Sequence, residues 1–223
     1  MTIDPSRTLA DLVVERPARG RVLERLGLDY CCGGRRSLEE ASRERGLDAK
    51  TVVAFLESEP AVSAVESRDW ASEPLADLCA HIVDVHHGRL RWELPRLTEL
   101  AERAAHVHGD DDPALRDVEC VLAELRRELD EHMDDEEAHL FPALVGGGKP
   151  GPDELARLEH EHADTGAALQ RLRELTRGYD RAAARCSTHR ALLDGLHGLE
   201  LDVHQHVHEE NNVLFPRARA LAA

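Results

Sequence analysis

The 223-residue chain has little positive charge and no long hydrophobic run. It has 28 basic side chains and 44 acidic ones, and the resulting net charge of −16 would repel both nucleic acid and anionic membrane surfaces. Because no apolar stretch approaches the length needed to span a bilayer, we expect no membrane partner. The first residues lack the basic and apolar blocks of a signal peptide, so we expect a cytoplasmic protein.

Cysteines and aromatic residues are also few. Five cysteines, an odd number with two of them adjacent, do not make a disulfide framework. Three Phe, two Trp and two Tyr fit an all-α protein better than a β-sandwich, and no segment shows convincing period-two alternation. Apolar residues recur instead at spacings of three and four, which predicts an all-α fold.

Short helices are predicted in a small N-terminal domain that covers residues 1–58. Gly27 should stop a first helical stretch, because glycine readily takes the left-handed conformation at a helix end. Ser37 and Glu40 have the spacing of a capping box that opens the next helix, and Asp48 can cap a further one. A domain this short has little core of its own.

A polar segment with two prolines, residues 59–74, reads as a linker to the rest of the chain. Residues 75–223 carry four long amphipathic segments, with Pro95 as an expected kink in the first. Their approximate bounds are 75–108, 114–145, 153–177 and 187–223. Short breaks between four such helices predict an antiparallel up-down-up-down four-helix bundle.

Histidine, by contrast, is abundant, with 14 residues, and part of this set belongs to an internal repeat. The segments His132–Pro142 and His206–Pro216 both read H-x-x-x-E-x-x-x-L-F-P, at an offset of 74 residues. His87 lies 45 residues before the first segment and His162 lies 44 before the second. The bundle therefore consists of two similar helical hairpins, each with the series His … His-x-x-x-Glu.

This spacing suits a metal site inside the bundle. Residues four apart on a helix lie on one face, about 6 Å from each other. The helix lengths place the two upstream histidines level with the repeated segments when neighbouring helices run antiparallel. Six candidate ligands result: His87, His132, Glu136, His162, His206 and Glu210.

Six ligands of this kind indicate two metal ions. They are too many for one tetrahedral site and too few to saturate two octahedral ions. Two metals that share Glu136 and Glu210, each with two histidines and an open position, fit the number. Imidazole with carboxylate favours iron, with manganese or zinc as alternatives, and the lack of thiolate ligands argues against a closed structural zinc site.

The other histidines are expected mostly on the surface or around the site. His86 competes with His87 as a ligand, and His160 competes with His162. His204 and His208 also have helical spacing, but the first repeat has aspartates at the equivalent positions. We therefore expect that pair on the surface.

At these residues the sequence resembles the hemerythrin-like family of four-helix di-iron proteins. Within it, three motifs resemble the iron–sulfur cluster repair di-iron proteins of the ScdA/YtfE type. They are D-Y-C-C-G-G at 29–34, H-H-x-x-L-R-x-E-L-P at 86–95 and E-N-N-V-L-F-P at 210–216. The resemblance covers nearly the whole chain, and its iron ligands fall on the same six residues. It implies two non-haem irons, bridged by carboxylate and by an oxo group when oxidised.

The resemblance also implies a function. Such a protein repairs iron–sulfur clusters damaged by oxidative or nitrosative stress, by supplying iron, by reacting with nitric oxide, or both. Its partners would be damaged iron–sulfur proteins, with nitric oxide or dioxygen as small ligands. Two alternatives stay open: an oxygen- or nitric oxide-binding sensor of hemerythrin type, and a di-iron nitric oxide reductase. Whether the protein is an enzyme and whether it forms a homodimer also stay open.

The adjacent Cys31 and Cys32 are the second candidate site. Neighbouring cysteines rarely bridge to each other without strain, and Arg35 and Arg36 could lower the pKa of a thiol here. That would suit a redox or iron-relay role, whereas the alternative is a loop in which both cysteines only pack. The family resemblance favours the functional interpretation. The remaining cysteines are expected to be small core residues: Cys79, Cys120 and Cys186.

Overall fold

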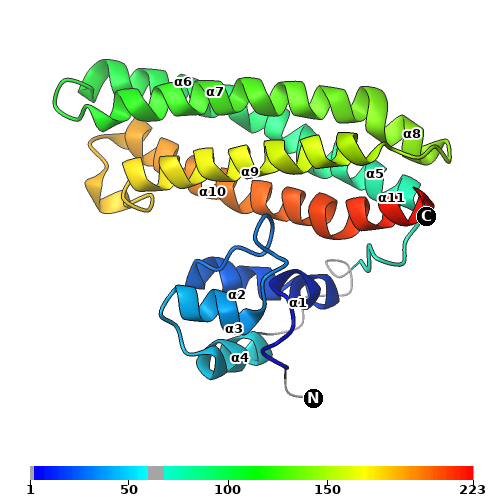
Figure 1. The fold of residues 1–223 in the computed structure, drawn as a ribbon. Helices are drawn as coiled ribbons and strands as arrows, with labels where there is room; N and C mark the ends of the chain where they lie inside the picture. Colours follow the sequence, from blue (N-terminus) through cyan, green and yellow to red (C-terminus); the bar gives the residue numbers. More distant parts are fainter. Residues whose placement is uncertain (1–2, 60–67, 223) are drawn as a thin grey trace. The chain divides into compact units, whose positions relative to one another are not determined.

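The computed structural model describes residues 3–59 and 68–222, and it is built from helices (Figure 1). Among these residues it contains no strand, only an isolated bridge between Thr8 and Ser37, so the predicted all-α class is confirmed. The chain forms two compact units. One combines the part up to Leu78 with the segment from His204 onward, and the other is Cys79–Val203.

Four short helices fold the N-terminal part: α1 (Leu9–Glu15), α2 (Arg19–Leu26), α3 (Leu38–Glu44) and α4 (Ala49–Ser58). Their ends follow the local signals. Gly27 terminates α2 with φ at 66°, and Ser37 and Glu40 form the expected capping box of α3. The Asp48 side chain accepts a hydrogen bond from the Thr51 amide and so caps α4.

A small apolar core holds these four helices together. Leu9, Leu12, Leu23, Leu38 and Leu56 are fully buried in it. Each such leucine contributes about 1.5–3 kcal/mol relative to an exposed position. These helices therefore pack around a core of their own, although a small one.

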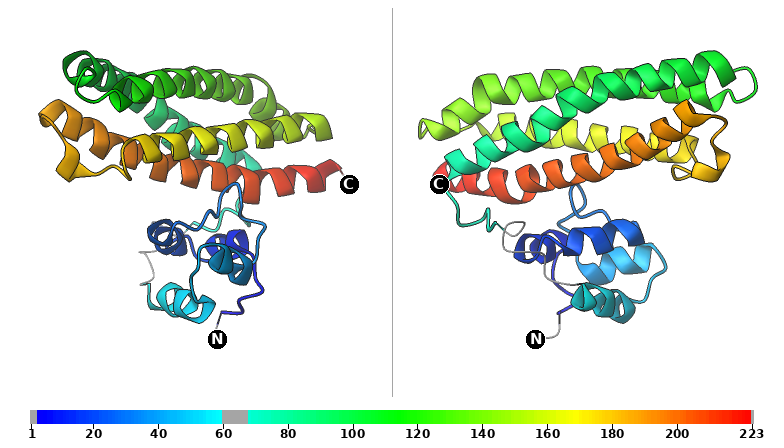
Figure 2. Two further views of the ribbon diagram at one scale, coloured as in Figure 1. Left: turned by 60° about the vertical axis from the view of Figure 1, so that its left-hand side comes forward. Right: turned by 180° about the vertical axis from the view of Figure 1, so that it is seen from behind.

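Four long helices run side by side in the larger part of the chain (Figures 1 and 2). They are α6 (Gly88–His108), α7 (Ala114–Asp135), α9 (Pro152–Leu175) and α10 (Ser187–Glu209). Successive helices run in opposite directions, as expected for an up-down-up-down bundle. Ion pairs tie α10 to two neighbours, with Arg173–Glu200 on α9 and Arg89–Asp202 on α6. Helix α10 continues from this unit into the other one.

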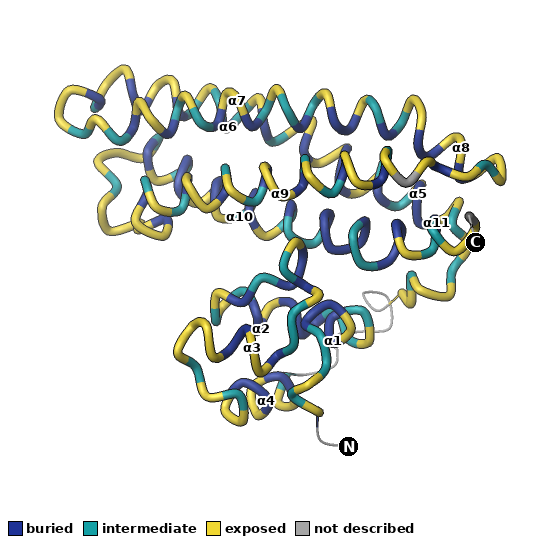
Figure 3. Tube along the Cα trace, in the orientation of Figure 1, coloured by how far each residue is buried: buried dark blue, intermediate teal, exposed yellow. Residues whose placement is uncertain are grey.

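The buried positions follow the helical period along these helices (Figure 3). Leu94 and Leu97 of α6 and Leu122 and Leu125 of α7 are fully buried, while charged residues occupy the outer faces. A polar residue inside such a core has to be hydrogen-bonded, paired or metal-bound, because burial without a partner is costly. No helix among the described residues is long and apolar enough to cross a membrane.

Three of the long segments contain a π-helical turn in addition to α-helix. These turns are η1 (Ile82–His87) between α5 (Leu75–His81) and α6, η2 (Glu136–Leu140) before α8 (Phe141–Val145), and η4 (Glu210–Leu214) before α11 (Phe215–Ala222). The amides of Gly88, Phe141 and Phe215 bond to carbonyls five residues earlier. A fourth irregular element, the 3₁₀ turn η3 (Arg181–Ala183), lies in the connection before α10.

The repeated L-F-P sequence explains two of the π turns. Pro142 and Pro216 have no amide hydrogen, and a proline ring clashes with the carbonyl four residues earlier in an α-helix. In both cases that carbonyl lies within the π turn, whose wider geometry relieves the clash. Pro95 instead lies inside α6, and the departure from α-helical geometry in that segment occurs upstream, at η1.

The predicted linker is described only in part, because residues 60–67 lie outside the described residues. The second half of the linker is held to the C-terminal helix through its backbone carbonyls. Arg217 donates hydrogen bonds of 2.6 Å to the carbonyls of Trp70 and Glu73, so Trp70 contacts the C-terminal helix through its main chain.

Candidate metal centre

All six predicted metal ligands are buried inside the protein. Three of them sit at the edge of a π turn: His87 ends η1, Glu136 begins η2 and Glu210 begins η4. The other three lie within regular helices, and none of the six is more than 6% exposed. A π turn shifts the direction of the side chains that follow it, which is one reason why such turns occur at functional sites.

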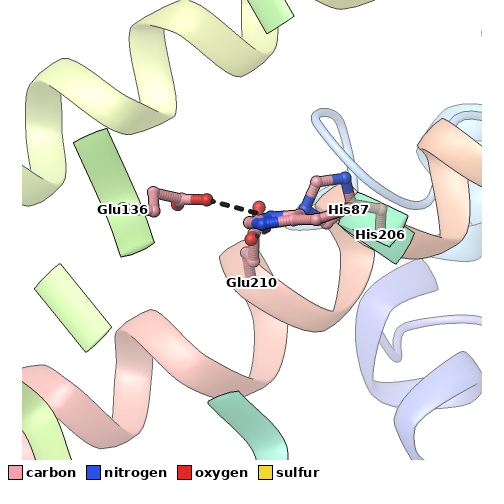
Figure 4. A group of neighbouring side chains, drawn as sticks. All are labelled: His87, Glu136, His206 and Glu210. Carbon is pink, nitrogen blue, oxygen red and sulfur yellow. Dashed lines mark hydrogen bonds and ion pairs between the residues drawn. The ribbon is translucent and has the colours of Figure 1, made fainter. Parts of the chain in front are cut away.

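The structure brings these residues together in two groups of four. The first is His87, Glu136, His206 and Glu210 (Figure 4), and the second is His132, Glu136, His162 and Glu210. Within each group the candidate ligand atoms lie within 4.8 Å of one another. Both groups contain the same two glutamates, and each adds two histidines. The sequence spacing predicted that these six residues would lie together, and the structure places them in groups that could hold a metal.

His87 is oriented by a carboxylate on its outer side. Its Nδ1 lies 2.8 Å from Oε1 of Glu137, and Arg91 donates to the same oxygen at 2.5 Å. Since an ionised carboxylate only accepts, Nδ1 carries a hydrogen, and Nε2 is the ring atom on the side of the candidate site. That Nε2 lies 3.5 Å from Oε2 of Glu136.

His132 is held in the same way by a different helix. Its Nδ1 lies 2.8 Å from Oε2 of Glu161, and Arg157 donates to Oε1 of that glutamate at 2.5 Å. The Nε2 of His132 then faces Oε2 of Glu136 at 3.5 Å and Nε2 of His162 at 3.0 Å. Each group therefore contains one histidine whose outer nitrogen contacts a glutamate and whose inward nitrogen lies near Glu136.

The two outer glutamates keep their negative charge at neutral pH. The hydrogen bond from His132, with help from Arg157, lowers the pKa of Glu161 to about 2 against the effect of burial. Burial raises the pKa of Glu137, but its hydrogen bonds with Arg91 and His87 outweigh burial and lower this pKa overall. Both carboxylates therefore stay acceptors and hold their histidines in the metal-binding tautomer.

The donor set fits a non-haem iron site. Glu136 and Glu210 are fully buried next to four imidazoles, and Nε2 of His206 lies 2.8 Å from Oε1 of Glu210. Two carboxylates without a cation would be costly at such a position, and nitrogen with oxygen donors is the combination that iron takes in proteins. These six residues therefore fit a non-haem iron site.

A polar cavity of about 320 Å³ reaches the second group. Its walls include His132 and Glu161 together with the acidic Glu128, Glu131 and Asp164. His132 is 6% exposed, whereas His87 is fully buried. Arg127 and Arg157 also line the cavity, so its wall combines acidic and basic side chains next to one candidate ligand, His132.

A third group of candidate ligands, His81, His86 and Glu209, escaped the sequence reasoning. The two histidines are five residues apart, a spacing that an α-helix would place on different faces. Their rings lie 5.3 Å apart between centroids, because His86 lies within the π turn η1, which begins directly after His81. His86 competed with His87 in the sequence, and the structure places it in this third group instead.

The expectation that His204 and His208 lie on the surface is wrong. His208 is 2% exposed, and burial lowers its pKa to about 4. Its ring packs edge-on against Tyr30 at 5.3 Å between centroids, and His204 pairs with Glu24 at 2.7 Å. These histidines differ from the aspartates of the first repeat because here the helix contacts the N-terminal helices.

The structure corrects the expected chemistry of Cys31. The hydrogen bond with Cys32, burial, and the negative charge of Asp29 all raise the pKa of Cys31, so that sulfur is a thiol rather than a thiolate. Cys31 is buried and Cys32 is exposed. The sequence reasoning weighed the arginines after the loop and missed Asp29 before it, whose carboxylate contacts the sulfur.

The single cysteines behave differently from each other. Cys79 is buried, as expected for a small core residue. Cys120 and Cys186 are exposed, so the expectation that they pack in the core is wrong. Cys120 lies on an outward position of α7, and Cys186 lies just before the first residue of α10.

Comparison with known families matches two parts of the chain. Residues 79–218 match the hemerythrin HHE cation binding domain, and these residues contain all six candidate ligands. Residues 5–59 match ScdA_N, a domain of unknown function (DUF542), and these residues contain both adjacent cysteines.

Several relatives are similar over nearly their whole length, and each is named iron-sulfur cluster repair protein YtfE. The protein of Pectobacterium carotovorum (strain PC1) is 36% identical over 95% of this chain and 96% of its own. That of Edwardsiella ictaluri (strain 93-146) is 38% identical at the same coverage, and that of Yersinia pseudotuberculosis (serotype O:1b) is 34% identical over 96% of each chain. With its buried histidine–glutamate centre and both matching domains, the chain belongs to the YtfE family of hemerythrin-like proteins.

Proposed function

We propose that this chain is a cytoplasmic di-iron protein that repairs iron–sulfur clusters after oxidative or nitrosative damage. The observation that carries the proposal is the pair of buried four-residue groups that share Glu136 and Glu210. The relatives named as iron–sulfur cluster repair proteins supply the reaction and its target, a damaged iron–sulfur protein.

In this proposal each group holds one iron. His87 and His206 serve one position, His132 and His162 serve the other, and the two glutamates bridge them. When bound, the irons would be exchangeable, and their open coordination positions would accept nitric oxide or dioxygen. We also propose the division into an N-terminal domain of residues 1–58 and a bundle of residues 75–223.

The protein's own side chains keep the centre ready to bind and release metal. Glu137 and Glu161 accept hydrogen bonds from Nδ1 of their histidines. The hydrogen is thereby kept on the outer nitrogen, so that the inward nitrogen of each ring can coordinate a metal. Arg91 and Arg157 hold these glutamates from the outside. The cavity beside His132, whose wall has four acidic residues and two arginines, gives a cation access to this ligand, because the acidic excess attracts it.

Matched histidine variants of the full-length protein test this function. We expect the wild type, reconstituted with ferrous iron under reducing conditions, to contain about two irons and to restore a nitric oxide-damaged iron–sulfur enzyme. His162→Gln should lower both iron content and repair. His160→Gln is the control, because that histidine lies two residues away with its side chain 79% exposed. Iron well below one per chain in the wild type, or equal repair by both variants, would overturn the proposal.

The same samples distinguish iron supply from nitric oxide chemistry. Repair that consumes bound iron, with little nitrous oxide produced, indicates iron supply. Multiple turnovers of nitric oxide to nitrous oxide indicate a reductase, and stable reversible oxygen binding without repair indicates a carrier or sensor. The last outcome would replace the repair function by the hemerythrin-like alternative.

A further inference from the structure

The loop that carries the two adjacent cysteines is folded around one carboxylate. Asp29 Oδ1 accepts hydrogen bonds from the amides of Cys31 and Cys32, each at 3.0 Å, and Oδ2 accepts from the amide of Gly33 at 2.8 Å. A side chain at Gly33 would clash with this carboxylate, since its Cβ would lie 2.7 Å from Oδ2. The loop geometry therefore depends on Asp29 and on glycine at this position.

A second residue holds the same loop from its other side. The Asn212 side-chain amide donates to the carbonyl oxygens of Tyr30 and Cys31 at 3.3 and 3.2 Å. The amides of the loop are thus satisfied by Asp29, and two of its carbonyls by Asn212. This leaves the sulfur atoms of the cysteines in a defined arrangement.

The two sulfur atoms lie close together but in different surroundings. Cys31 Sγ is 3.9 Å from Cys32 Sγ, and it also donates to Asp29 Oδ1 at 3.3 Å. Cys31 is 5% exposed, whereas Cys32 is exposed to solvent. One thiol is therefore accessible, and the other lies behind it with a proton acceptor in contact.

We propose that Cys31 and Cys32 form a dithiol site that captures a single thiophilic atom, such as trivalent arsenic, with Asp29 as the positioning residue and proton acceptor for Cys31. The exposed Cys32 sulfur binds first, and Cys31 closes the chelate while its proton moves to Asp29. This site goes beyond the proposed repair function and uses none of the histidine–glutamate ligands.

The reaction balances for an organic arsenic(III) oxide as the probe. Two As–S bonds form, the bond between arsenic and oxygen breaks, and the oxygen leaves as water with the two thiol protons. Arsenic stays trivalent, so neither an oxidant nor a reductant is needed. The proton that Asp29 accepts from Cys31 returns to the departing oxygen or to solvent, which leaves the carboxylate ionised again.

Phenylarsine oxide added to the reduced full-length protein tests the dithiol. We expect one arsenical per wild-type chain by intact mass, and protection of both cysteines from iodoacetamide. Cys31→Ser and Cys32→Ser should each weaken binding at least about 100-fold, because one As–S bond is lost. The double variant Cys120→Ser/Cys186→Ser, which removes the exposed single cysteines, should bind like the wild type. Unchanged binding by Cys31→Ser would overturn the proposal.

Asp29→Asn tests the proton acceptor separately. It keeps one side-chain oxygen for the loop amides but removes the charge, so we expect the second As–S bond to form about tenfold more slowly at neutral pH. Added acetate should restore part of the rate, and the difference from wild type should shrink as the pH rises. A purely structural role would not respond to acetate. Two results would refute the role of Asp29. One is formation of the second As–S bond by Asp29→Asn at the wild-type rate, and the other is a slow rate that responds to neither acetate nor pH.

Discussion

The two helical hairpins that supply the candidate ligands have similar sequence motifs but different backbone geometries. In the first hairpin both helices contain a π turn at a ligand, with His87 at the end of η1 and Glu136 at the start of η2. In the second, only the last helix does, and His162 lies in the regular helix α9. A repeat of ligand types therefore does not imply a repeat of backbone geometry.

The two four-residue groups also differ in their access to solvent. In the group with His132 and His162, His132 borders the polar cavity, and Glu161, which orients His132, forms part of the cavity wall. The group with His87 is oriented by Glu137, and His87 itself is fully buried. If each group holds one iron, as proposed, we expect the iron near His132 to exchange more readily than the iron near His87.

The largest effect is expected from a residue that belongs to both groups. Glu136→Gln removes the charge of a fully buried carboxylate, and loss of one partner from a buried charged pair costs about 3–5 kcal/mol. Iron affinity should therefore fall at least about 100-fold at both positions. Metal analysis after dialysis measures this, with exposed Glu124→Gln on the same helix as control. If one iron remained tightly bound, Glu136 would not be shared.

A smaller effect should separate the two outer glutamates. Glu137→Gln and Glu161→Gln each remove a carboxylate that fixes a histidine ring, a change that typically costs about 10–100-fold in metal affinity. We expect each variant to weaken a different one of the two irons, and the double variant to weaken both. Metal titration of the single and double variants measures this. If both single variants weakened the same iron, the assignment of one outer glutamate to each group would be wrong.

Metal removal should show the unequal access directly. A small chelator should extract the iron next to the cavity at least about fivefold faster than the other, because solvent access controls release. Loss of absorbance with time would then show two phases of equal size. Widening the cavity by Glu128→Ala should speed only the fast phase. A single phase for the wild type would contradict the proposed difference between the groups.

The smallest effect is expected from the prolines that follow the π turns. Pro142→Ala or Pro216→Ala restores an amide hydrogen and lets η2 or η4 relax toward α-helical geometry. A change of about 1 kcal/mol would weaken iron binding about fivefold. Pro95→Ala, inside α6 and away from the ligand turns, is the control. Equal iron affinity in all three variants would show that the π turns do not set the ligand geometry.

Local signals predicted much of the fold. Ser37 and Asp48 cap helices as expected, and Gly27 ends one, because a cap needs only residues adjacent in the chain. The candidate ligands were found for a similar reason. The period of a helix puts His132 with Glu136 and His206 with Glu210 on common faces, whatever the packing around them.

Features that depend on residues distant in sequence were not predictable in this way. The burial of His208 comes from its contact with Tyr30, far away in the sequence. The high pKa of Cys31 comes from its neighbours Cys32 and Asp29 and from burial, and these act only once the loop is folded. The group of His81, His86 and Glu209 requires the π turn η1. Unlike the other two π turns, η1 is not followed by a proline from which it could be predicted.

The sequence by itself determined the helical class, the helix ends and the six residues suited to a metal centre, because these follow from neighbours along the chain and from the helical period. Only the tertiary structure decided which histidine faces which glutamate, which of two adjacent cysteines is buried, and which group borders a cavity. Those properties depend on the low polarity of the protein interior and on the distances between side chains of different helices. Both arise only when the helices pack, so they cannot be predicted from any single segment.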